Sequence, residues 1–209
     1  MLRSVLLVLP LVLAAGWFAE SANAHDDPVE LIRQTTGELF SLLEDNRGEY
    51  EENPDLLRAE IERVLLPAVD RVHSARLVLG RHGRGQSRED IEAFADALTD
   101  ALLSRYATGL LQFRSREQVE ILPLTGDNTE RQTRVRTRIR LDSGSRAPVD
   151  YVLHFRNDRW QIFDVIVEGI SYVATFRNQI GEEIRRSSFE DVLNRLQSGE
   201  LDIDIEDNG

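Results

Sequence analysis

The spacing of the apolar residues changes along this chain, and that change limits the folds that the sequence can adopt. In residues 28–113 apolar residues recur every three or four positions, which is the period of an amphipathic helix. In residues 119–167 they alternate with polar residues over several stretches, which is the period of a half-buried strand. After Gly169 the helical period returns and continues to Leu196. Helices, then strands, then helices again predict an α+β fold.

Prolines and glycines divide the helical parts. Pro28 and Pro54 suit the first turn of a helix, and Gly80 suits the position after its end. Ser87, followed by Asp90 three residues later, resembles a capping box and marks another helix start. These signals predict helices at 28–46, 54–65, 68–79, 88–113, 170–180 and 188–196.

The alternating part predicts a four-stranded antiparallel sheet, with strands at 119–122, 133–141, 149–155 and 160–167. In the second strand four arginines alternate with apolar or threonine residues, so the arginines should share one face. These are Arg134, Arg136, Arg138 and Arg140. Strict alternation gives the last strand two faces, which are Trp160, Ile162 and Ile166, and Phe163, Val165 and Val167.

The first 24 residues have the pattern of a signal peptide. Arg3 precedes an apolar run at residues 5–19, and Ala22 and Ala24 place small residues where signal peptidase reads them. We expect residues 1–24 to be removed on export, although an uncleaved N-terminal anchor is the alternative. Residues 25–209 then form one domain with an acidic tail at 200–209, for which disorder is expected over an extra strand.

Composition narrows the classes of function. The net charge is −12, which repels nucleic acid and anionic lipid headgroups, so no nucleic-acid partner is expected. The chain has no cysteine, which excludes thiol chemistry and thiolate metal sites. His73, His82 and His154 are scattered without metal-ligand spacing, and neither a G-x-S-x-G motif nor a phosphate-binding glycine loop occurs. We therefore predict no catalytic residues, no metal and no cofactor.

Residues 160–171 resemble the signature of the MlaC family, also called toluene-tolerance auxiliary proteins. The signature is a Trp followed by D-V-x-x-E-G-[VI]-S, here from Trp160 to Ser171, and then an aromatic-Arg pair, here Phe176 and Arg177. Two weaker pieces agree in order and spacing: P-x-x-D followed by L-G within residues 66–80, and L-L-x-x-Y-A at residues 102–107. The resemblance runs from about Pro28 to Leu196.

This resemblance implies a periplasmic phospholipid carrier with a curved sheet wrapped by helices. Such proteins exchange lipid between an outer-membrane lipoprotein complex and an inner-membrane ABC transporter complex with a substrate-binding ring protein. The acyl chains are buried and the headgroup stays outside. We expect a monomer in which Asp164, Glu168 and Arg177 organise the strand-to-helix corner. The predicted pocket walls are Leu102, Tyr106, Tyr151, Leu153, Val165, Val167, Ile170, Val173 and Phe176.

Two other classes of function stay open. In an enzyme on a similar cone-shaped α+β fold, Asp164 and a tyrosine would act as acid and base in an apolar cavity. In a ligand-free periplasmic adaptor, the four-arginine row and the acidic tail would be the working surfaces. The apolar strand faces also suit an ordinary packed core, and the arginine row suits a solvated outer face.

Overall fold

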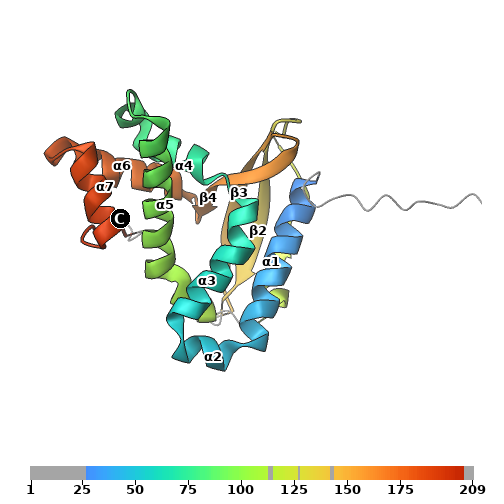
Figure 1. Ribbon diagram of the computed structural model, residues 1–209. Helices are drawn as coiled ribbons and strands as arrows, with labels where there is room; N and C mark the ends of the chain where they lie inside the picture. The colour runs from blue at the N-terminus through green and yellow to red at the C-terminus, as the bar shows by residue number, and fades with distance from the viewer. Residues whose placement is uncertain (1–26, 113–114, 127, 142–143, 205–209) are drawn as a thin grey trace, which may run out of the picture.

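The computed structural model describes residues 27–204, except 113–114, 127 and 142–143 (Figure 1). Within these ranges it has seven α-helices and a five-stranded antiparallel sheet, which confirms the α+β prediction. The predicted signal peptide, Phe113 and the end of the acidic tail lie outside the described residues. The elements are α1 (Pro28–Asp45), α2 (Arg47–Glu52), α3 (Pro54–Leu65), α4 (Arg71–Leu79), α5 (Arg88–Tyr106), β1 (Val119–Ile121), β2 (Gln132–Arg140), β3 (Arg146–Arg156), β4 (Arg159–Val167), β5 (Ile170–Ser171), α6 (Tyr172–Arg186) and α7 (Phe189–Ser198).

The helix starts follow from local capping. The side chain of Asp27 accepts hydrogen bonds from the first turn of α1, and Ser87 and Asp90 form the predicted capping box of α5. Helix α2 is absent from the sequence-based prediction, because Gly48 suits the end of a helix. The chain instead makes a further short helix there, which buries Tyr50.

The strands follow one another in the order β1-β2-β3-β4-β5, so each pairs with its neighbours in sequence. The prediction of four strands missed β5, because a two-residue strand carries no periodic signal. Figure 1 shows α1 lying alongside β2, whereas β4 runs from the sheet toward α4 and α6. The sheet thus contacts α1 through β2 and contacts α4 and α6 through β4.

Strand β4 contains a β-bulge, which corrects the predicted faces of this strand. Val152 pairs with Asp164 and Leu153 with Ile162, so Phe163 is left without a partner across the ladder. Because paired residues share a face, Val165 lies on the same side as Ile162, and Ile166 lies on the opposite side. The Ser74 hydroxyl donates a 2.8 Å hydrogen bond to the free Phe163 carbonyl.

The apolar side chains form three clusters. The helical cluster lies among α4, α5, α6 and α7 and contains Phe94, Phe176 and Ile180. The sheet cluster lies between α1 and the sheet and contains Leu31, Leu153 and Ile162. The α2 cluster lies where α1, α2, α3 and the 3-10 helix at Ala107–Gln112 meet.

The first part of the acidic tail is packed against the helices, so the expectation of disorder is wrong there. Leu201 and Ile203 are buried in the helical cluster, although they form no strand. The carboxylate of Asp204 accepts hydrogen bonds from the Tyr106 hydroxyl at 3.0 Å and from Arg105 at 2.8 Å. The chain end thereby joins α5 to α6 and α7.

Candidate functional site

Four of the nine predicted pocket residues share one face of the sheet. Val165 pairs with Tyr151 and Val167 with Val149, and Leu153 pairs with Ile162. We call this face, which α1 covers in part, the inner face. Leu153 is fully buried in the sheet cluster. Tyr151, Val165 and Val167 are only partly covered, so the inner face keeps apolar surface that its own helices do not fill.

Tyr151 is the most informative residue of this face. Burial raises the pKa of its hydroxyl to about 12, so the group lies deep within the fold. The side chain is nevertheless partly accessible, and its hydroxyl makes no hydrogen bond with any residue that the structure describes. Its place on a partly covered apolar face makes Tyr151 a candidate contact for an apolar ligand.

The other five predicted residues lie elsewhere. Leu102, Val173 and Phe176 pack in or against the helical cluster. The Tyr106 hydroxyl donates a hydrogen bond to Asp204. Ile170, in β5, is 42% exposed. The structure therefore brings together Tyr151, Leu153, Val165 and Val167 but does not gather all nine residues around one space.

Several partly buried leucines were not predicted as site residues. They pack against the α2 cluster from α3, α5 and the 3-10 helix that follows α5. The signal that could have found them is a run of adjacent leucines, because a helix with a single core-facing stripe does not need two apolar residues in a row. These residues are Leu65, Leu103, Leu110 and Leu111.

The corner between β4 and α6 is organised as predicted, with Asp164 at its centre. The Ser171 hydroxyl donates to one oxygen of Asp164 at 2.6 Å, and the Val173 amide donates to the other at 3.0 Å. Glu168 adopts a φ of 52° in the turn, and Arg177 donates to the Leu77 carbonyl. Both oxygens of Asp164 thus hold the start of α6, which leaves this carboxylate poorly placed to act as an acid or base.

The four-arginine row lies on the opposite face of β2, as the alternation predicted. We call this side of the sheet the arginine face. Arg134 lies 3.7 Å from Asp150, and Arg136 donates to the Thr125 carbonyl. Arg138 and Arg140 are exposed, and neither forms an ion pair with a described residue. The role of this row in docking stays a prediction.

Two of the histidines are not scattered, which corrects the sequence-based expectation. The ring centroids of His73 and His154 are 4.6 Å apart, and His154 Nε2 lies 3.0 Å from Asp70 Oδ2. The strand and helix that carry them are distant in sequence, so residue spacing could not reveal the pair. Among the described residues no group of three or more His, Cys, Asp or Glu side chains could hold a metal ion.

Within the described ranges, none of the helices combines the length and the apolar character needed to cross a bilayer.

The fold joins a partly covered apolar sheet face to helices that precede and follow the sheet. Comparison with known proteins gives the family: the family model described as "MlaC protein" matches residues 33–198. The chain belongs to the MlaC family. MlaC-family proteins are lipid carriers and not enzymes, and this membership decides against the enzyme alternative.

Two relatives match over most of their length. The chain is 28% identical to the toluene tolerance protein ttg2D of Pseudomonas putida, over 89% of this chain and 84% of the relative. It is 24% identical to the intermembrane phospholipid transport system binding protein MlaC of Haemophilus influenzae, over 94% of this chain and 92% of the relative.

A solved structure has the same fold. It is the phospholipid-binding protein of Ralstonia solanacearum, determined in complex with a phospholipid. The TM-score is 0.73 at 16% identity, over 84% of this chain and 96% of the other.

Proposed function

We propose that this protein holds a phospholipid by its acyl chains against the inner face and carries it through the periplasm. The observation that supports this proposal most is the incomplete cover of Tyr151, Val165 and Val167 on an otherwise apolar face. The Ralstonia protein was solved with a phospholipid bound, and the Haemophilus relative is named for phospholipid transport, so both agree with this ligand class.

The energetics of such a carrier fit the residues of the inner face. Each methylene group exposed to water costs about 0.8 kcal/mol, so two acyl chains with about 30 methylenes would cost roughly 24 kcal/mol in an aqueous gap. A dry apolar surface offsets that cost without any catalytic group. The Tyr151 hydroxyl, which has no partner among the described residues, lies where the chains would replace solvent.

We infer the compartment and the partners from the family and the charge. The signal-peptide pattern at residues 1–24 suits export to the periplasm. The net charge of −12 disfavours adsorption to an anionic bilayer, so delivery should depend on partner proteins. The proposed partners are an outer-membrane lipoprotein complex and an inner-membrane ABC transporter complex with its ring protein, each meeting a monomer of this chain.

Replacement of Val167 by Glu tests the proposal. A carboxylate on the inner face would be costly beside acyl chains, so we expect the folded variant to lose bound phospholipid. Native mass spectrometry and lipid extraction of the purified full chain measure this loss. Leu56→Glu is the matched control, because Leu56 is already exposed on α3 and this variant should keep its lipid. Unchanged lipid content in Val167→Glu would refute the placement.

A further inference from the structure

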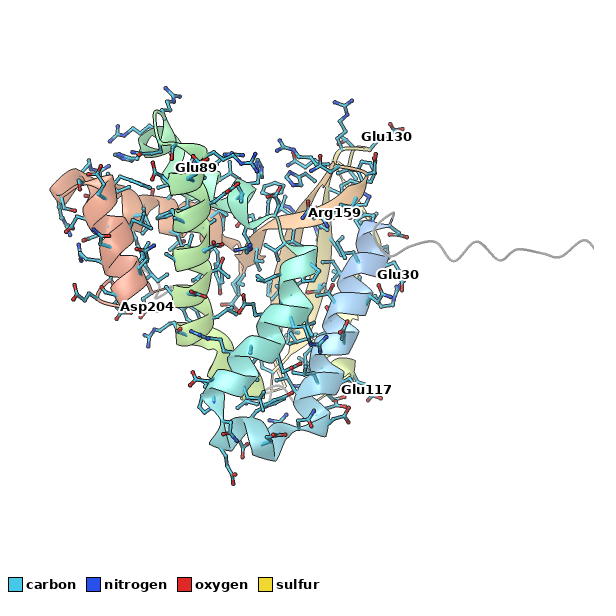
Figure 2. All side chains as sticks on the ribbon, viewed as in Figure 1. Glu30, Glu89, Glu117, Glu130, Arg159 and Asp204 are labelled. Carbon is cyan, nitrogen blue, oxygen red and sulfur yellow. The ribbon has the colours of Figure 1, made fainter. Side chains whose placement is uncertain are left out.

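A cleft lies beside the arginine face of the sheet, at the end where β3 turns into β4. Its volume is about 680 Å³, and it is formed by α4, the start of β2 and the β3–β4 turn. Gln132 pairs with His154 and Arg156 with Arg159, so these side chains belong to the face turned away from the inner face. Figure 2 labels Glu130 and Arg159 at this end of the sheet. Most of this lining therefore lies away from the proposed place of the acyl chains, while Phe155, which also lines the cleft, belongs to the inner face.

Cationic and hydrogen-bonding groups dominate the lining. Arg131 and Arg156 line the cleft together with His73 and His154, and neither arginine forms an ion pair with a described residue. Asp158 is the carboxylate that the lining contains. The lining therefore carries two guanidinium groups and one carboxylate, in a protein with a net charge of −12.

Burial and charges of both signs act on the two histidines. Burial is the main cause that lowers the pKa of His73, and the charges of His154 and Arg156 lower it further. Burial also lowers the pKa of His154, and Arg156 again adds to this effect, while Asp70 opposes it for both rings. Arg76 on α4 also lowers the pKa of His73. An anion bound in the cleft would favour the protonated imidazoles and so raise both pKa values.

The cleft is held in place by the bulge in β4. The Phe163 ring contacts both imidazoles, with centroid distances of 5.1 Å to His73 and 5.2 Å to His154. Asp70 accepts from the His73 backbone amide and contacts His154, so it fixes α4 against β3. The His73 imidazole makes no hydrogen bond within the described part of the chain, so its N–H group is available to a ligand.

We propose that this cleft binds a phosphate group through Arg131, Arg156 and the His73 imidazole. Guanidinium groups match the oxygens of phosphate in paired hydrogen bonds, and a tetrahedral anion can accept from donors that approach from several sides. These donors come from the residue before β2, from the end of β3 and from α4, so three separate elements contribute to the site. The phosphate group can belong to a small soluble molecule or to the headgroup of a lipid in a bilayer.

NMR titration of the purified full chain with inorganic phosphate tests this site. We expect millimolar phosphate to raise the pKa values of His73 and His154 and to leave that of His82 unchanged. Sodium chloride at equal ionic strength should produce no such change. In the double variant Arg131→Gln/Arg156→Gln the phosphate affinity should fall at least tenfold. The matched control Arg138→Gln/Arg140→Gln, on the same face but outside the cleft, should keep the affinity.

Two further binding measurements identify the source of the phosphate group. Binding of glycerol phosphate without binding to phosphatidylglycerol vesicles assigns a soluble ligand, and vesicle binding that depends on Arg156 assigns a headgroup. The proposal is overturned if phosphate acts equally on the double variant, or if a glutamate-rich peptide binds the cleft and phosphate does not. Lipid co-purification should be normal in the double variant, so this outcome is independent of the test at Val167.

Discussion

The helical cluster and the sheet cluster differ in how completely they bury their apolar side chains. Most members of the helical cluster are fully buried, and Leu201 and Ile203 from the chain end complete it. The sheet cluster has almost as many partly buried as fully buried members. Both are built from similar residues, so apolar composition does not distinguish a closed core from a surface with room for a ligand. What distinguishes them is the cover that neighbouring elements provide.

Phe94→Ala should have the largest effect, because it opens the closed core. Phe94 is 0% exposed and contacts Phe189 across the helical cluster. We expect the free energy of unfolding to fall by about 3–5 kcal/mol. Urea denaturation measures this change. Lipid content per folded molecule should stay normal, and a selective loss of lipid would contradict the separation of the two clusters.

Ile203→Ala tests whether the chain end belongs to the closed core. Ile203 is 3% exposed in the helical cluster, and its loss should cost about 2 kcal/mol, the low end for such a change because a chain end can relax. Asp202→Ala is the control, since Asp202 is exposed and should change stability by less than about 0.5 kcal/mol. Equal effects of the two variants would show that the tail adds nothing to the core.

Two tyrosines allow a matched comparison of the regions. Tyr106→Phe removes the hydroxyl that donates to Asp204 and should cost about 1 kcal/mol. Tyr151→Phe removes a hydroxyl on a partly exposed side chain that has no partner in the described residues, so the stability of lipid-free protein should change by less than about 0.5 kcal/mol. Thermal denaturation of both variants after lipid removal measures the difference. A cost at Tyr151 similar to that at Tyr106 would mean that its hydroxyl is bonded.

Acidification should have the smallest effect, and it acts through the arginine face. Burial lowers the pKa values of His73 and His154 below the 6.5 of the unfolded chain, so the unfolded state binds protons more readily. Their contribution to stability is complete above about pH 6.5 and is lost as the pH falls through the folded values. Melting temperatures at about pH 7.5 and 5.5, without phosphate, should show a smaller decrease for His73→Phe than for the parent chain. An equal decrease would exclude His73 as the cause.

The fold was largely predictable because its signals are local. Capping residues such as Ser87 and prolines such as Pro54 act within one helical turn, so they can be read from neighbouring residues. The bulge at Phe163 has no such signal, because it depends on how β4 meets β3 and α4. Helix α2 and strand β5 were missed for the related reason that both are too short to show a period.

The candidate site was predictable only in part. The register joined Tyr151, Leu153 and Val165 on one face, but the bulge and not simple alternation brought Val165 there. Phe176 was assigned to the pocket because it lies in the family signature, whereas packing places it in the helical cluster. The pairing of His73 with His154 depends on tertiary contact and could not be inferred from spacing.

The bulge at Phe163 has a consequence for how this family can vary. Deletion of Phe163 would leave Ile162, Val165 and Val167 on the inner face, because the strand would then alternate regularly. The bend, the contacts of the Phe163 ring with both histidines and the hydrogen bond from Ser74 would be lost. A single deletion could therefore straighten β4 in one evolutionary step while preserving which residues face the ligand. The bend of β4 and the alternation of its side chains can therefore change independently at this position.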